Sequence, residues 1–406
     1  MKGLFPRLEA IYDPDRKNDT RYGGAISLKR MWDYLDCDRL LHSAGIQKRS
    51  GVPASCLAFN YVLKPMMDAG SIKRANTRTR GDQLLQALIP GHDQSTLNRF
   101  LNGPHDWLTL NDLRIQELQK RSRTRALEEG GLIVLDDVVI RKSGERMEEI
   151  AYVWDPVEGK AVLGYDLVVL YYTDGEKSYP LSFAYKLKEN DRISLAVQLA
   201  EGLGRLGVEA RRVVFDAWYF ALELITHLRD LGLSWVTRSK KNRLFTVDGA
   251  TVHAEDIIQS GTKEAEAQLP GYGPVKVVVA EINDKKRLLV TGDLRMKWKE
   301  VVKVYRDRFL IDNPFFRDSK QEMGLADFHT RRFGALVAHT VMCFLSYTLV
   351  SLVRLFDRGL LDKTVGWVKE NLFRAVAGVK RVGGGLAVIL GRGLELISSL
   401  SHAVSI

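Results

Sequence analysis

The sequence feature that most constrains the fold is an apolar run, LIVLDD, that ends in two carboxylates, Asp136 and Asp137. Segments rich in β-branched and aromatic residues follow it, with a Thr-Asp-Gly-Glu turn at 173–176. A second apolar run, VVFD, ends in Asp216 and has a helix-like segment on each side. Strands that alternate with helices in this way are typical of an α/β fold.

Two strands that both lead into carboxylates predict a cation site. Acidic side chains are costly to bring together unless a cation neutralises them, and carboxylate oxygens are the ligands that Mg²⁺ prefers. Two such ions can hold the attacking and leaving oxygens of a phosphoryl displacement. Because successive side chains of a strand point to opposite faces, we expect only one of Asp136 and Asp137 to bind metal. The alternative for each Asp is a turn or helix-cap residue.

The segment YRDRFLID carries the next group of polar residues. Tyr305, Arg308 and Asp312 are spaced i, i+3 and i+7, which places them on one face of a helix. Lys320 follows eight residues after Asp312. The same spacing is also expected of an amphipathic helix with salt bridges on its exposed face.

The charge balance suggests a polyanionic partner. Lys and Arg total 60 against 50 Asp and Glu, which gives a net charge of +10. Basic residues cluster at 73–80 and 120–125 in a region of helical spacing. These clusters are either solvated helix faces or surfaces that contact phosphates. Three cysteines are too few for a disulfide framework and favour a reducing compartment, so we expect a cytoplasmic protein.

Residues 333–353 contain no Asp, Glu, Lys or Arg and are long enough to cross a bilayer. The stretch is interrupted by polar residues that include His339, Thr340 and Ser346. We therefore predict a buried core helix and no membrane partner.

The order of all these segments resembles a bacterial insertion-sequence transposase of the DDE type, in the insertion-sequence-four superfamily. That superfamily has a Tyr-x2-Arg-x3-Glu-x6-Lys signature around its third catalytic carboxylate, and Tyr305, Arg308, Asp312 and Lys320 stand in similar places. The resemblance extends over residues 85–360. The other segments that carry it are DQSTLNRFLNGPHDW, LIVLDDVVIRKSG, GYDLVVLYYTDGEKSYPLSFAYK, VVFDAWYF and WVTRSKKNRLF.

The resemblance implies an α/β protein in which a β-rich insertion interrupts an RNase H-like catalytic core and an all-helical N-terminal region precedes it. The expected parts are a helical region that binds DNA ends (1–128), the first part of the core (129–239), the insertion (240–297), the second part of the core (298–360) and a helical C-terminal tail (361–406).

The resemblance also implies a function, a DNA transposase that cleaves and joins the ends of its mobile element. Asp136, Asp216 and Asp312 would hold two Mg²⁺ ions, for which Mn²⁺ would substitute. The expected partners are double-stranded DNA, as terminal inverted repeats and target, and a second copy of the chain in a synaptic homodimer. Such a protein would be associated with the nucleoid.

Four further residues would contact DNA according to the resemblance. Tyr305, Arg308 and Lys320 would contact phosphates near the cleaved bond, and arginine suits this because its planar fork binds phosphate oxygens in pairs. Trp298 lies near the place where relatives stack a Trp on a flipped base. The alternative for Trp298 is a core or hinge aromatic.

Two departures from the signature leave alternatives open. Asp312 stands where the superfamily has Glu, and the gap to Lys320 is one residue longer. Pro314 also disfavours a helix through Asn313, so Asp312 is able to cap the next helix instead. Glu322 is then the alternative third carboxylate, as Asp137 is the alternative first one. The alternative functions are a catalytically impaired DNA-binding protein descended from a transposase and a metal-dependent DNA nuclease on the same fold.

Overall fold

The computed structural model describes residues 8–12, 19–309, 315–374, 377–382 and 385–390. The chain forms two compact units. The first contains residues 1–124, 144–148 and 317–406, and the second contains 125–143 and 149–316. The division falls inside the range 298–360, which the sequence assigned to one part of the core.

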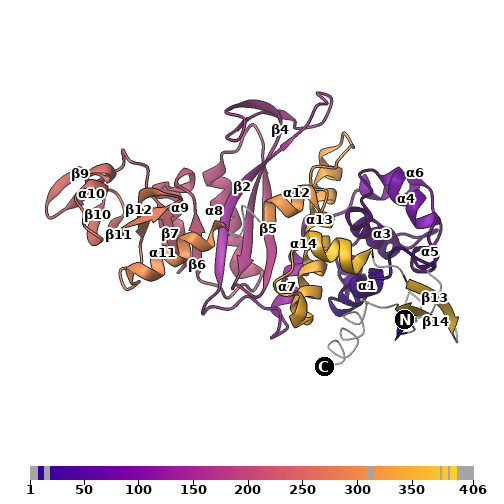
Figure 1. Ribbon diagram of the computed structural model, residues 1–406. Helices are drawn as coiled ribbons and strands as arrows, with labels where there is room; N and C mark the ends of the chain where they lie inside the picture. The colour runs from indigo at the N-terminus through magenta and orange to yellow at the C-terminus, as the bar shows by residue number, and fades with distance from the viewer. Residues whose placement is uncertain (1–7, 13–18, 310–314, 375–376, 383–384, 391–406) are drawn as a thin grey trace. The chain divides into compact units, whose positions relative to one another are not determined.

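Helices build most of the first unit (Figure 1). Its amino-terminal helices are α1 (Ala25–Tyr34), α2 (Cys37–Ser43), α3 (Ala54–Met66), α4 (Ile72–Arg80), α5 (Gln83–Leu88), α6 (Gln94–Leu101) and α7 (Trp107–Gln119). Its later helices are α12 (Arg317–Gln321), α13 (Phe333–Phe356) and α14 (Val365–Trp367). Asp93 caps α6, since its carboxylate accepts a hydrogen bond from the backbone N–H of Thr96 at 2.8 Å.

The long apolar helix α13 is the centre of this unit. It is long and apolar enough to cross a membrane, but 94% of its most apolar window is buried within the protein. Two of its buried polar side chains have partners, because Ser346 donates to the carbonyl of Val62 at 3.0 Å and Thr348 accepts from Arg114 at 2.7 Å. Buried hydroxyls that are satisfied in this way do not oppose packing. The prediction of a buried core helix is confirmed.

A small sheet in the first unit differs from the expected all-helical N-terminal region and helical C-terminal tail. Strand β1 (Leu8–Tyr12) pairs in parallel with β14 (Gly385–Leu390), which pairs antiparallel with β13 (Ala377–Val382). Glycine lies near both tail strands, and each has only six residues with Val or Ile among them. Such short segments satisfy their backbone groups better in a sheet than in a helix.

The second unit contains one large mixed sheet (Figure 1). Strand β4 pairs antiparallel with β3, β2 and β5, and β2 pairs in parallel with β6, which pairs in parallel with β7. The strands are β2 (Leu132–Arg141), β3 (Ala151–Asp155), β4 (Lys160–Thr173), β5 (Ser178–Lys186), β6 (Arg212–Phe215) and β7 (Ser234–Arg238). Helix α8 (Arg192–Arg205) connects β5 to β6, and α9 (Leu222–Asp230) connects β6 to β7.

The segment predicted as a β-rich insertion continues this same sheet. Strand β12 pairs antiparallel with β7, and the sheet then runs through β11, β10, β8 and β9. The bounds are β8 (Leu244–Val247), β9 (Ala250–His253), α10 (Ala254–Gln259), β10 (Glu264–Leu269), β11 (Gly273–Ile282) and β12 (Lys285–Thr291), and α11 (Trp298–Asp307) follows. The insertion therefore shares its backbone hydrogen bonds with the core strands.

Part of the basic cluster at 120–125 is used inside the first unit. The carboxylate of Glu117, whose side chain is 7% exposed, pairs with Arg39 at 2.7 Å, Arg121 at 2.9 Å and Lys120 at 3.3 Å. The guanidinium of Arg123 donates to the carbonyl of Leu355 at 3.1 Å. Burial alone would raise the pKa of Glu117, but these cations outweigh it and lower the pKa below its usual range.

We expect Glu117→Gln to reduce the free energy of unfolding by about 1–3 kcal/mol at neutral pH, because charged hydrogen bonds become neutral ones. A depressed pKa contributes stability above the usual Glu pKa, and this contribution is lost as pH falls through the folded-state value. Urea unfolding at several pH values should therefore show wild type and variant converging in acid. Glu370→Gln is the control, since Glu370 is exposed and its pair with Arg374 should contribute little. An equal gap at all pH values would contradict the assignment.

Candidate functional site

The parallel register of three strands places the site. Leu135 of β2 pairs with Phe215 of β6, which pairs with Thr237 of β7. The next residues along these strands are Asp136, Asp216 and Arg238. Because parallel strands run in the same direction, residues that follow paired positions lie level with one another at the carboxyl end. The sheet therefore brings Asp136 and Asp216 together, as the sequence predicted.

One part of the sequence interpretation was wrong: β2 does not end at the two carboxylates. It continues to Arg141 and pairs with β4 along its whole length, with Asp136 opposite Val169 and Asp137 opposite Val168. The β-branched residues after the carboxylates extend the strand against β4. Only the pairing with β6 stops at Leu135, so Asp136 lies at a strand end on one side and within a ladder on the other.

Helix α11 and the residue directly after it place two further predicted residues beside these carboxylates. The guanidinium of Arg308, which is 7% exposed, forms a salt bridge with the Asp136 carboxylate. The hydroxyl of Tyr305 donates a long hydrogen bond of 3.4 Å to Asp216. Burial raises the pKa of Tyr305 to about 12, so this phenol stays protonated and is a donor at neutral pH.

Asp216 also has a cationic partner that the sequence did not point to. Arg238 donates from Nε to Oδ1 of Asp216 at 2.7 Å and from Nη2 to Oδ2 at 3.4 Å. Burial opposes the ionised form of Asp216, but the hydrogen bond and charge of Arg238, together with the charge of Arg308, lower its pKa. Asp216 is therefore ionised and available as a ligand for a cation.

Asp137 belongs to a different network from Asp136. It accepts a hydrogen bond from the Tyr219 hydroxyl at 2.9 Å and pairs with Arg192 at 3.2 Å. Arg192 also pairs with Asp166 at 2.7 Å. Burial raises the pKa of Asp137 to about 6, and the charge of Asp166 adds to this while Arg192 opposes it. Asp136 pairs with Arg308 and Asp137 with Tyr219 and Arg192, but both line the same cavity, so which of them binds metal stays a prediction.

These carboxylates open into a cavity of about 770 Å³ in the second unit, which Asp136, Asp137, Asp166 and Asp216 line together with Arg192, Arg238 and Arg308. Three exposed aromatic side chains also line it. Tyr152 is 72% exposed, Trp154 56% and Trp218 63%, and the ammonium of Lys240 lies 4.3 Å from the Trp218 ring centroid. Such a cavity offers both charge and stacking surface to a ligand.

The structure places the remaining predicted residues as follows. Asp312 lies outside the described residues. Lys320 is on α12 and Glu322 directly follows that helix, both in the first unit, where Glu322 pairs with Lys369 at 3.2 Å. Trp298 begins α11, and the ammonium of Lys263 lies 3.5 Å from its ring centroid. The roles of all these residues stay predictions.

Sequence reasoning missed four residues of the site: Asp166, Arg192, Tyr219 and Arg238. One signal was present, because Asp166 interrupts the apolar strand GYDLVVLYY and is only 1% exposed. A carboxylate in such a strand requires a cationic partner. The partner is Arg192 at the start of α8, and the spacing of residues along the sequence did not predict it.

The donor set fits a divalent cation in part. Within the described ranges, no group of three or more His, Cys, Asp or Glu side chains gathers to hold a metal ion. Asp136 and Asp216 nevertheless present carboxylate oxygens to one cavity, and Mg²⁺ is commonly held by one or two carboxylates together with water and substrate phosphates. The two residues fit this kind of site, with Arg308 and Arg238 as their present counter-charges.

The site thus combines carboxylates and arginines in one cavity at a mixed sheet. Residues 129–349, more than half of the chain, match the family model described as Transposase DDE domain. The chain belongs to this family of transposases.

Similarity to solved structures is remote. The chain is similar to the piggyBac transposase in a synaptic complex with hairpin DNA, at 11% identity over 88% of this chain and 87% of that one, with a TM-score of 0.43. It is also similar to the Drosophila P element transposase in a strand transfer complex, at 12% identity over 52% and 50%, with a TM-score of 0.25. No curated protein matches the chain.

We expect Arg308→Met to destabilise the metal-free protein by about 3–5 kcal/mol, because it leaves the Asp136 charge buried without its counter-ion. Adding Asp136→Asn to this variant should recover part of the loss, since the unpaired charge is then absent. Urea unfolding of the two single variants and the double variant forms the cycle that measures the coupling. Lys303→Met on the same helix is the control, because its pair with Asp307 is exposed. Strict additivity would refute the pairing.

Proposed function

We propose that the chain is a DNA transposase that cleaves and joins the ends of its mobile element by two-metal phosphoryl transfer. The observation that carries this proposal is the level placement of Asp136 and Asp216 in one cavity, within a chain of the transposase DDE domain family. The remaining details rest on the resemblance of the sequence to insertion-sequence transposases.

The order of the core strands supports an RNase H-like core. The sheet runs β5-β4-β2-β6-β7. Strand β4 is antiparallel to both β5 and β2, whereas β2, β6 and β7 are parallel to one another. Helix connections join β5 to β6 and β6 to β7. This is the order and direction of strands in an RNase H-like sheet, with the segment 240–297 added beyond β7.

We assign Asp136, Asp216 and Asp312 as the ligands of two Mg²⁺ ions, with Mn²⁺ as a substitute. Bound ions of this kind lower the pKa of coordinated water and neutralise charge on the reacting phosphate. The protein keeps Asp216 ionised through Arg238 and holds Asp136 against Arg308. Arg238 and Arg308 line the same cavity, where each would be able to bind oxygens of a phosphate.

Tyr305 and Arg308 fit the role of phosphate contacts because they reach the same two carboxylates from one helix. We include Lys320 and Trp298 as DNA contacts on the resemblance alone. Asp312 is preferred over Glu322 as the third carboxylate, since it stands four residues after Arg308, in the place of the signature's Glu. Asp136 is preferred over Asp137 because it directly follows Leu135, where the pairing of β2 with β6 ends level with Asp216.

The proposed partners are double-stranded DNA, as the terminal inverted repeats and the target, and a second copy of the chain in the synaptic complex. A net charge of +10 favours association with a polyanion. All three cysteines are free and buried, in keeping with a reducing compartment, and we infer a cytoplasmic, nucleoid-associated protein.

Asp216→Asn and Asp136→Asn should reduce cleavage to background, since each removes a negative ligand while keeping the shape of the side chain. The assay uses purified protein, Mg²⁺ or Mn²⁺, and labelled DNA from the inverted repeats that flank the gene. Asp230→Asn is the control, because Asp230 is exposed on α9 away from the cavity-lining residues. Full cleavage by Asp216→Asn would overturn the proposal.

The same assay separates the alternative functions. A transposase gives joined strand-transfer products, a nuclease gives nicks alone, and an impaired DNA-binding protein gives specific binding without cutting even in Mn²⁺. Only joined products support the proposal, and either of the other two results excludes it.

The choice of third carboxylate makes a separate prediction. Asp312→Asn should lose cleavage as completely as Asp216→Asn, because all three charges are needed to hold two divalent cations. Glu322→Gln should retain cleavage and instead lower stability modestly through the weakened pair with Lys369. Parallel cleavage and thermal unfolding measurements on both variants decide it. The reverse pattern would move the assignment to Glu322.

A further inference from the structure

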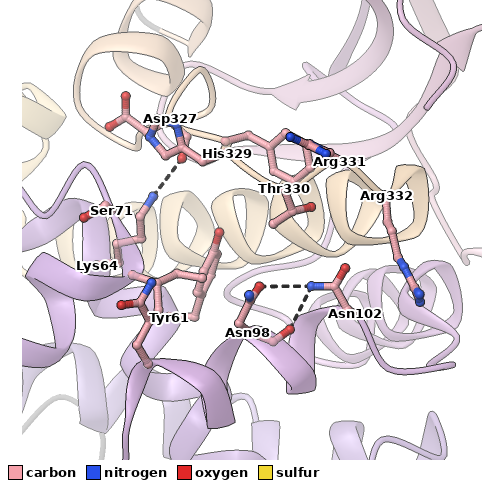
Figure 2. Close-up of a pocket in the computed structure, with 13 residues that line it drawn as sticks. Tyr61, Lys64, Ser71, Asn98, Asn102, Asp327, His329, Thr330, Arg331 and Arg332 are labelled. Atoms are coloured by element: carbon pink, nitrogen blue, oxygen red, sulfur yellow. Dashed lines mark hydrogen bonds between the residues drawn. The ribbon is translucent and has the colours of Figure 1, made fainter. Parts of the chain in front are cut away.

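A second cavity lies within the first unit and shares no residue with the candidate functional site. It has a volume of about 390 Å³ and opens among α3, α6 and the segment that leads into α13 (Figure 2). Cavities of this size hold small ligands or single nucleotides of a larger chain. The residues that line it are mostly cationic or polar, with Lys64, Asn98, Thr330, Arg331 and Arg332 among them.

Lys64 is the first sign that the cavity is built to hold an anion. The residue is only 2% exposed, and its ammonium donates to the carbonyl of Asp327 at 3.1 Å and lies 5.4 Å from the Tyr61 ring centroid. Burial lowers its pKa, which reflects the cost of holding this charge away from water. The charge of Asp327 opposes this shift only in part, and a carbonyl and a ring face are weak partners for a buried cation, which an anion compensates best.

Thr330 is an independent second sign. Its hydroxyl oxygen is buried, and among the described residues it has no hydrogen-bond partner. The hydroxyls of Ser27, Ser55, Ser319 and Ser351 are also unpartnered among the described residues, but of these five only Thr330 lines the cavity, where a bound group is able to satisfy it. Thr330 lines the same cavity as Lys64, so one bound group is able to satisfy both side chains.

The mouth of the cavity has the charge that such a ligand requires. Arg331 and Arg332 are exposed, and no ion pair joins either guanidinium to a carboxylate in the described part of the chain. The lining contains a single acidic residue, Asp327, against the three cations. The planar guanidinium of arginine presents two donors side by side, and this geometry matches two oxygens of one phosphate.

The helix α6 adds amide groups beside the arginines. Gln94, Asn98 and Asn102 follow one another at intervals of four residues and all line the cavity. Asn102 donates from its amide nitrogen to the backbone carbonyl of Asn98 at 2.8 Å, which fixes its orientation (Figure 2). Side-chain amides together with arginines are typical of surfaces that contact the sugar-phosphate backbone of nucleic acids.

We propose that this cavity binds a backbone phosphate of double-stranded DNA, held by Lys64, Thr330 and the Arg331-Arg332 pair. The inference rests on the proposed function for its ligand class, and it adds a DNA-anchoring site in the unit that does not contain the catalytic carboxylates. The site positions DNA and takes no part in bond cleavage. Its contribution is electrostatic, so it depends on salt and acts on DNA of any sequence.

The test measures binding of the full chain to a short labelled duplex of arbitrary sequence by fluorescence anisotropy, in EDTA so that no cleavage occurs. We expect Arg331→Ala combined with Arg332→Ala to weaken binding by about tenfold or more and to reduce the slope of log K against log salt by about one for each phosphate that is no longer neutralised. Arg49→Ala is the matched control, because Arg49 is exposed in the same unit and does not line the cavity. Equal affinity and slope in the double variant and the control would overturn the proposal.

The buried groups are tested by substitutions that preserve shape. Thr330→Val should weaken binding without lowering stability, because the hydroxyl has no partner among the described residues to lose. Lys64→Met should weaken binding with retained folding, which circular dichroism checks. If Thr330→Val binds as wild type and Lys64→Met does so as well, the cavity does not hold the phosphate and the inference fails.

The source of the phosphate is decided by competition. Inorganic phosphate should raise the melting temperature of wild type but not of the Arg331→Ala, Arg332→Ala variant, and duplex DNA should compete for the same site. Protection by inorganic phosphate without competition by DNA would assign the site to a free anion and overturn the DNA inference. The catalytic proposal is tested by cleavage in Mg²⁺ and this inference by binding in EDTA, so failure of the one and failure of the other give different results.

Discussion

The candidate site depends on one backbone constraint, the point at which β2 and β6 stop pairing. Their shared ladder ends at Leu135 and Phe215, so the next residue of each strand, an aspartate in both, emerges at the same level. No loop has to be ordered to bring the two carboxylates together, because the hydrogen bonds of the sheet already do so. Precision of this kind is what phosphate chemistry requires of its metal ligands.

Carboxylates withdrawn from water at this edge of the sheet require cations close by. Arg308 and Arg238 each neutralise one carboxylate, and Arg192 bridges Asp137 and Asp166. Each of these aspartates therefore has an arginine as its ion-pair partner. Because the cations come from separate elements, α11, β7 and α8, the helices around the sheet are fixed by charge as well as by apolar packing.

Much of this arrangement could be predicted from local sequence, but not all. The runs LIVLDD and VVFD identified Asp136 and Asp216, and helical spacing grouped Tyr305 with Arg308, because each signal lies within one element. Arg192 and Arg238 were missed since their partners lie on other elements, and no local pattern records such pairs. The pairing of β1 with β14 was missed for the same reason, because more than 370 residues separate paired positions such as Leu8 and Leu386.

The pairing of β12 with β7 limits how this protein can be shortened. The segment 240–297 covers the edge of β7 with three residue pairs, Leu289 with Arg238 among them. Removing it would expose a row of unpaired backbone N–H and C=O groups, a template for association with another chain. It would also leave Arg238, the partner of Asp216, at a frayed strand end. The segment is therefore a fixed boundary of the sheet, not a module that can be trimmed.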